Sequence, residues 1–162
     1  MAYLTEEEVY SGTKKLLKSK GFILLGGQPP RGVNHIPVIE IKSGFNLEKG
    51  SRGSYKPDLV AFDNNFFYVI ECKPNYCKED IVKLNQVLSS EERLKSLYVE
   101  LVQRNLIKKI NWEGNFEIFK KSIRIAHAYS DKLVSEKGIC HIVVENAAGE
   151  GRIVDLGEST ET

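Results

Sequence analysis

Two carboxylates and a lysine stand out in the middle of the chain. Pro57-Asp58 opens a run of strand-forming residues, and Glu71-Cys72-Lys73 closes a second run that follows a short turn. Two strands joined by a tight turn pair antiparallel, so Asp58 and Glu71 should face each other at the same end of the hairpin. The spacing therefore predicts that two acidic groups and Lys73 converge.

Convergent carboxylates at the end of an apolar strand favour a divalent cation. An unpaired buried carboxylate costs on the order of several kcal/mol. Asp58, Glu71 and the main-chain carbonyl of Cys72 offer the oxygen ligands that Mg²⁺ prefers, and Lys73 would orient a water or stabilise developing charge, which predicts phosphodiester hydrolysis. The alternative is structural, with Asp58 capping a turn. Glu71 would then pair with Lys73 or Lys56 at a sheet edge.

The first helix and the hairpin carry clear local patterns. Thr5 and Glu8 have the spacing of a capping box, which predicts a helix over 5–20. The hairpin strands span 58–62 and 66–72, and the Asp and Asn residues between them tolerate positive φ. Both strands are strongly apolar, which indicates a buried position in a sheet.

The rest of the chain alternates between helical and strand-like patterns. Apolar residues at helical spacing predict helices over 78–88 and 90–107. Strand-rich segments on either side of these helices predict an α/β (α+β) fold, a mixed β-sheet flanked by helices. The strands expected outside the hairpin are 22–25, 35–42, 122–129, 139–145 and 152–156.

Length and composition suit one globular domain. The chain has 162 residues, of which 41% are hydrophobic and 28% are charged. We expect a single domain over 1–156 and a flexible tail over 157–162. No apolar run is long enough to span a membrane and the first residues lack a signal-peptide pattern, which predicts a cytoplasmic protein with no membrane partner.

The cysteines and histidines do not form a familiar metal motif. The three cysteines have C-x4-C spacing plus one distant residue, which fits reduced and mostly buried thiols better than a zinc site. His127 and His141 both fall within expected strands, where core or surface histidines are commoner than ligands.

The carboxylate motif resembles that of the PD-(D/E)xK phosphodiesterases, which include many restriction endonucleases, Holliday junction resolvases and RecB-related exonucleases. Here the pattern is Pro57-Asp58, twelve intervening residues and Glu71-Cys72-Lys73. The resemblance runs from the first helix to the helix after the motif. It implies a restriction endonuclease-like core of αβββαβ order and a nuclease domain that uses Mg²⁺, with Mn²⁺ as a substitute.

The resemblance also suggests two further site residues. In junction resolvases a glutamate of the first helix lies beside the metal, which points to Glu7 or Glu8. Because Glu8 is also the capping partner of Thr5, we favour Glu7. In the RecB-like branch a glutamine on the next helix faces the site, and Gln86 lies on that helix here. Ser90 stands where a tyrosine usually accompanies that glutamine, and an exposed helical glutamine is the alternative.

Charge is distributed unevenly along the chain. Residues 14–56 hold nine basic and two acidic side chains, whereas residues 136–162 hold two basic and six acidic ones. A basic stretch of this kind suits a phosphate backbone, although its helical lysines could equally be a solvated helix face. We expect DNA contacts from Lys14, Lys18, Lys49, Arg52, Tyr55 and Lys56.

The leading functional hypothesis is a Mg²⁺-dependent endonuclease of DNA, of restriction, recombination or repair type. One alternative is a catalytically silent DNA-binding module of nuclease fold, or a subunit of a larger nuclease complex. Another is a sequence-specific restriction enzyme with recognition elements within 89–121. One active site cuts one strand, so cleavage of both strands would call for a homodimer or a heteromeric nuclease partner.

Overall fold

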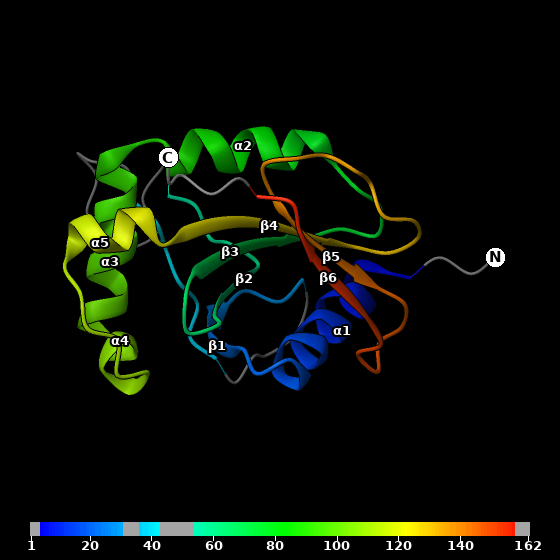
Figure 1. The fold of residues 1–162 in the computed structure, drawn as a ribbon, viewed down its shortest axis with the longest axis horizontal. Coiled ribbons are helices and arrows are strands. Elements are labelled where there is room, and N and C mark those ends of the chain that lie inside the picture. Colours follow the sequence, from blue (N-terminus) through cyan, green and yellow to red (C-terminus); the bar gives the residue numbers. More distant parts are fainter. Residues whose placement is uncertain (1–3, 31–35, 43–53, 158–162) are drawn as a thin grey trace.

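A six-stranded mixed sheet forms the centre of the computed structural model, which describes residues 4–30, 36–42 and 54–157. The strands lie side by side in chain order, and Figure 1 shows α1 on one face of the sheet and α2 on the other. The strands are β1 (Ile23–Gly27), β2 (Leu59–Phe62), β3 (Phe67–Cys72), β4 (Ile123–Tyr129), β5 (Cys140–Val144) and β6 (Gly151–Asp155). The helices are α1 (Glu6–Ser19), α2 (Lys78–Leu88), α3 (Glu91–Gln103), α4 (Leu106–Lys109) and α5 (Phe116–Lys121).

The sheet combines an antiparallel and a parallel part. β1, β2 and β3 form an antiparallel meander, β3, β4 and β5 run parallel, and β6 returns antiparallel to β5. A parallel neighbour needs a crossover connection, and helices α2 to α5 supply it between β3 and β4. The expected α/β class with a mixed sheet flanked by helices is therefore confirmed.

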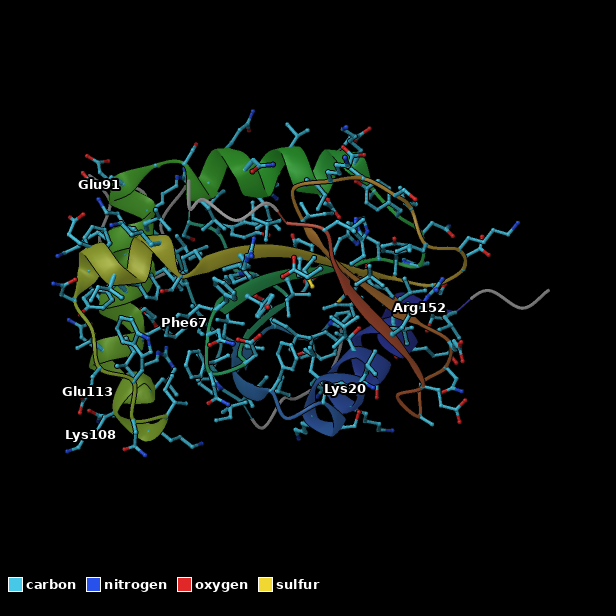
Figure 2. All side chains as sticks on the ribbon, in the orientation of Figure 1. Lys20, Phe67, Glu91, Lys108, Glu113 and Arg152 are labelled. Carbon is cyan, nitrogen blue, oxygen red and sulfur yellow. The ribbon has the colours of Figure 1, made fainter. Side chains whose placement is uncertain are left out.

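Each face of the sheet has its own apolar core, because side chains alternate along every strand. Along β2, Leu59 and Ala61 pack toward α1, whereas Val60 and Phe62 pack toward the crossover helices. Phe67 is fully buried in the second core, where its ring contacts Phe119 and Trp112. Figure 2 shows Phe67 inside the fold, with labelled charged side chains such as Lys108 at its periphery.

The predicted capping box and hairpin are both present. The Thr5 hydroxyl accepts a hydrogen bond from the Glu8 N–H, and the Glu8 carboxylate accepts one from the Thr5 N–H. In the hairpin turn, the Asp63 carboxylate accepts hydrogen bonds from two following backbone N–H groups, and Asn64 adopts a φ of 83°. These elements form because their stabilising contacts are local in sequence.

The structure differs from the predicted secondary structure at three places. In the described part of the 35–42 segment only Ile41 pairs, through an isolated bridge to Tyr55, so no strand forms there. The helix expected over 90–107 ends at Gln103, because Asn105 takes a left-handed conformation before α4. Helix α5 was not predicted, although the side chain of Asn115 caps it. Of the tail, residues 158–162 lie outside the described ranges.

Helix α1 approaches the sheet closely at Gly12, which yields a test of the packing. A Cβ atom at this position would lie 2.4 Å from the Asn146 carbonyl oxygen and 2.6 Å from a Val144 methyl group. Alanine is favoured over glycine within a helix by about 1 kcal/mol, yet we expect Gly12→Ala to lower the free energy of unfolding by about 1–3 kcal/mol through overpacking. Denaturant unfolding measures it, and the exposed Lys15→Ala serves as control. A stabilised Gly12→Ala would contradict this packing.

Candidate active site

Asp58 and Glu71 face each other at the end of the hairpin. The register that pairs Leu59 with Ile70 brings Asp58 opposite Glu71. The Asp58 N–H donates to Glu71 Oε2 at 3.3 Å, and the Cys72 N–H donates to Asp58 Oδ2 at 2.8 Å. Glu71 is 8% exposed. The structure thus brings together the two carboxylates that the sequence singled out.

The carboxylate pair resists carrying two negative charges. Burial, and then the charge of Glu71, raise the pKa of Asp58 to about 8, although the hydrogen bond from Cys72 acts in the opposite direction. Close carboxylates raise each other's proton affinity, because both cannot ionise without repulsion. The pair therefore retains a proton near neutral pH unless another cation replaces it.

Lys73 lies between acidic groups from both faces of the sheet. Its ammonium nitrogen is 3.7 Å from Glu6 Oε1 on α1 and 3.9 Å from Asp80 Oδ2 on α2. The charge of Asp80 makes the largest contribution to raising the pKa of Lys73, and Glu6 adds to it. Lys73 therefore places a positively charged ammonium group, paired with Glu6 and Asp80, beside the carboxylate pair.

The acidic residue that α1 contributes to this region is Glu6. We had expected Glu7 or Glu8, but Glu8 is occupied in the capping box and Glu7 lies on the exposed side of the helix. Helical periodicity predicts the position of Glu6, because Glu6 precedes the buried Val9 and Tyr10 by three and four positions and therefore lies on the same face of α1. Counting back along the apolar face would have selected Glu6.

Two more groups lie near the pair, and the sequence analysis assigned neither of them to the carboxylate site. Asp80, in the first turn of α2, has a buried Oδ2 without a hydrogen-bond partner among the described residues. Tyr55 was expected to contact DNA, but it is only 6% exposed and its ring packs in the core. Burial of this degree does not fit a DNA contact from the Tyr55 side chain.

Helix α1 carries Lys14 and Lys18, two of the basic residues that were expected to contact DNA. The Lys14 ammonium nitrogen lies 4.9 Å from the centroid of the Tyr10 ring. Partial burial, and then the nearby charges of Lys18 and Lys15, lower the pKa of Lys14. These lysines are therefore close enough to act as one positive patch.

The other predicted site residues are exposed or lie outside the described ranges. Lys56 is exposed, and Lys49 and Arg52 lie outside the described residues. Gln86 is exposed on α2, in line with the alternative of an exposed helical glutamine; the buried face of this helix consists of Ile81, Leu84, Val87 and Leu88.

Backbone hydrogen bonds attach the segment after β3 to the parallel half of the sheet. The Lys73 N–H donates to the Ala128 carbonyl, and the Ser130 N–H donates to the Pro74 carbonyl. The Cys77 N–H donates to His127 Nε2 at 3.1 Å, which requires a neutral imidazole with its proton on Nδ1. These bonds determine where α2 begins, and hence where Asp80 meets Lys73.

The two histidines within the described ranges, His127 and His141, are fully buried and hydrogen-bonded inside the fold. Burial lowers the pKa of His127 to about 4. His141 Nδ1 is hydrogen-bonded to the Tyr129 hydroxyl, and its Nε2 to the Glu136 carbonyl oxygen. All three cysteines are free thiols, and Cys77 is the least buried of them.

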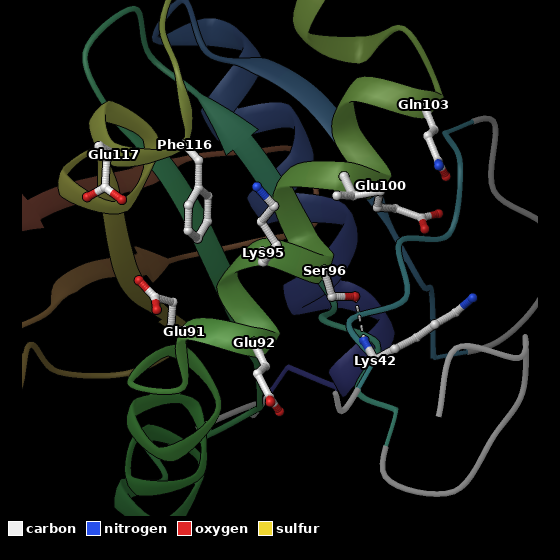
Figure 3. Close-up of a pocket in the computed structure, with 10 residues that line it drawn as sticks. Lys42, Glu91, Glu92, Lys95, Ser96, Glu100, Gln103, Phe116 and Glu117 are labelled. Atoms are coloured by element: carbon white, nitrogen blue, oxygen red, sulfur yellow. Dashed lines mark hydrogen bonds between the residues drawn. The ribbon is translucent and has the colours of Figure 1, made fainter. Parts of the chain in front are cut away.

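A separate cleft of about 770 Å³ lies along α3 and α5 (Figure 3). Figure 3 shows Lys95 and Phe116 at its wall and a hydrogen bond from the Lys42 N–H to the Ser96 hydroxyl. Its walls carry four glutamates and two lysines and include none of the residues of the carboxylate pair. An acid-rich wall does not suit a polyanionic substrate.

The described residues offer few side-chain ligands for a divalent cation. Within these ranges no three His, Cys, Asp or Glu side chains converge as metal ligands. Mg²⁺ commonly binds through one or two carboxylates and keeps several waters, so the Asp58–Glu71 pair meets that requirement without a third side chain.

Comparisons with family models, curated proteins and solved structures gave no match to this chain. Among the described helices, none combines the length and apolar character needed to cross a bilayer. The functional argument therefore rests on the site.

The neutral His127 predicts a pH-dependent stability. Because burial lowers its pKa to about 4 from 6.5, the unfolded chain binds the extra proton first as the pH falls. His127 therefore stabilises the fold fully above pH 6.5, and this contribution is lost between pH 6.5 and 4, by up to about 1.4 kcal/mol per pH unit. His127→Gln should flatten this part of the stability profile in urea unfolding. Equal slopes in both proteins would contradict the assignment.

Proposed function

We propose that this protein is a metal-dependent nuclease that hydrolyses phosphodiester bonds in DNA. The observation that carries the proposal is the pair of facing carboxylates, Asp58 and Glu71, with Lys73 held beside them. A buried like-charge pair is costly for stability, and such groups concentrate at functional sites. The surplus of negative charge there favours a cation.

The residues that would hold Mg²⁺, or Mn²⁺ in its place, are Asp58, Glu71 and the main-chain carbonyl of Cys72. When bound, the ion would polarise the phosphodiester and lower the pKa of a water molecule. Asp58 must give up the proton that its raised pKa retains, so binding of the cation strengthens as the pH rises.

Lys73 contributes a fixed positive charge. Its ion pairs with Glu6 and Asp80 keep the ammonium group protonated and in place. A protonated amine can donate a hydrogen bond to the attacking water or to a phosphate oxygen, where negative charge develops during hydrolysis. Lys73 would thus act through charge and orientation.

The order of elements supports the same proposal. The PD-(D/E)xK resemblance implies a helix, a three-stranded meander, a helical crossover and a fourth strand parallel to the third. The chain follows this order from α1 through β1, β2 and β3 to β4. The motif lies on β2 and β3, at the end from which the crossover leaves.

DNA is the favoured substrate because a basic patch lies on the helix that reaches the site. Glu6 marks the site end of α1, and Lys14 and Lys18 follow eight and twelve residues later. At 1.5 Å per residue, these lysines lie roughly 12–18 Å along the helix from Glu6. That distance corresponds to roughly four to five phosphates of one strand, at about 3.4 Å of helix axis each.

Substitution of Asp58 should separate activity from stability. Asp58→Asn keeps the shape and can still accept the Cys72 hydrogen bond, but it removes a metal ligand and a charge. We expect metal-dependent cleavage to be lost, while the free energy of unfolding at pH 8 rises by on the order of 1 kcal/mol or more. The folded pKa is raised, so this gain should disappear as the pH falls to 4.

The cleavage assay would use supercoiled plasmid, linear duplex, single-stranded DNA and a four-way junction with Mg²⁺, Mn²⁺ or EDTA. Lys73→Ala should be inactive on every substrate that the wild type cuts. Normal cutting by Asp58→Asn and Lys73→Ala would refute the proposed active site.

The two neighbouring glutamates of α1 offer a matched comparison. Glu6→Gln removes one of the charges that hold Lys73, whereas Glu7→Gln changes an exposed position on the same helix turn. We expect the first substitution to lower the cleavage rate about tenfold or more and the second to change it much less. Equal effects would show that α1 does not contribute through Glu6.

A second candidate is a nuclease-fold module that binds DNA without cutting it. The neighbouring lysines of α1, Lys14, Lys15 and Lys18, favour it, because they would attract a phosphate backbone whether or not a metal is bound at the carboxylate pair. Retained DNA binding in EDTA, with no cleavage in any divalent metal, would select this function.

A further inference from the structure

Tyr55 has a buried hydroxyl group that the fold itself does not use. The side chain is only 6% exposed, and the hydroxyl has no hydrogen-bond partner among the described residues. Buried polar atoms are nearly always paired, and an unpaired one calls for an explanation such as a bound ion, a water or a functional role. Asp80 Oδ2 also lacks a hydrogen-bond partner among the described residues, but it forms an ion pair with Lys73.

The position of Tyr55 is tightly restrained. Its backbone forms two hydrogen bonds of 2.7 Å with Ile41, and its ring packs in the core between the sheet and the crossover helices. The ammonium nitrogen of Lys83, on α2, lies 5.0 Å from the centroid of the ring. These contacts leave the hydroxyl little freedom to turn away from the carboxylates.

Acidic groups act on the hydroxyl of Tyr55. Burial contributes most to raising the pKa of Tyr55 far above its usual value, and the charge of Glu71 contributes next, followed by Asp58 and Asp80. The hydroxyl therefore stays protonated and can donate a hydrogen bond to a carboxylate oxygen. Glu71 is the charged group that acts on it most strongly, yet the two groups are not hydrogen-bonded in this structure.

We infer that Tyr55 is a positioning residue for Glu71, donating a hydrogen bond to this carboxylate when Glu71 binds the divalent cation. The inference rests on the proposed function. Metal-ligating carboxylates are usually oriented by a hydrogen bond from a neighbouring group, and loss of that group weakens metal binding about 10–100-fold. Tyr55 is a buried hydrogen-bond donor close to Glu71. Its backbone is fixed by the β-bridge to Ile41, and it belongs to a segment outside the hairpin.

The test is Mn²⁺ binding to the intact protein, without DNA, by calorimetry. Tyr55→Phe keeps the ring and removes only the hydroxyl. We expect the dissociation constant of Mn²⁺ to rise about tenfold or more, with the thermal midpoint of the metal-free protein nearly unchanged. Tyr76→Phe is the matched control, because Tyr76 also has a buried hydroxyl without a hydrogen-bond partner in the described ranges, but it lies against His127 and faces Glu136. Tyr76→Phe should bind Mn²⁺ as the wild type does.

The outcomes separate this inference from the proposed function. Equal Mn²⁺ affinity in the wild type and Tyr55→Phe overturns the role of Tyr55 and leaves the nuclease proposal intact. A wild type that binds no Mn²⁺ overturns both. If Tyr55→Phe does not fold, a structure of the wild type with Mn²⁺ bound decides the question. A hydroxyl within about 3 Å of a Glu71 oxygen supports the inference, and a longer separation overturns it.

Discussion

Repulsion between the carboxylates of the half-buried Asp58 and the buried Glu71 is the constraint on which the arrangement of this protein depends. Two backbone N–H groups, those of Asp58 and Cys72, offset part of the cost by donating to the carboxylates. The raised pKa of Asp58 shows that this compensation is incomplete. A protein that needed only stability would place an amide or an apolar residue here, because a buried charge must be paired to be tolerated.

The sheet connects this pair to helices on both of its faces. β3 leads directly to Lys73, whose ion pairs reach Glu6 on α1 and Asp80 on α2. The segment that follows is held on β4 by backbone hydrogen bonds and by His127, so the start of α2 is determined by the parallel half of the sheet. Packing in both cores therefore sets the geometry of the charged groups, although none of the core side chains takes part in their chemistry.

Incorrect expectations share a physical origin. Residues 35–42 have a strand-like pattern, but only Ile41 finds a pairing partner, because a strand requires a neighbour as well as an alternating sequence. Tyr55 looked like an exposed aromatic in a polar, basic stretch, yet its bridge to Ile41 draws the ring into the core. Helix α5 is short, and a single capping residue, Asn115, is a weak signal for a helix in the sequence. The helix is stabilised by packing of Phe119 on Phe67, a contact that the sequence does not reveal.

Local contacts explain what the sequence by itself determined: the capping box of α1, the hairpin turn and the meeting of Asp58 with Glu71. Each depends on residues that are separated by only a few positions in the sequence or are connected through one tight turn, so their spacing alone specifies the geometry. Only the tertiary structure decided that Glu6, Tyr55 and Asp80 surround the same carboxylates. These residues come from separate elements, and their meeting depends on how two helices pack on opposite faces of one sheet, which no local pattern encodes.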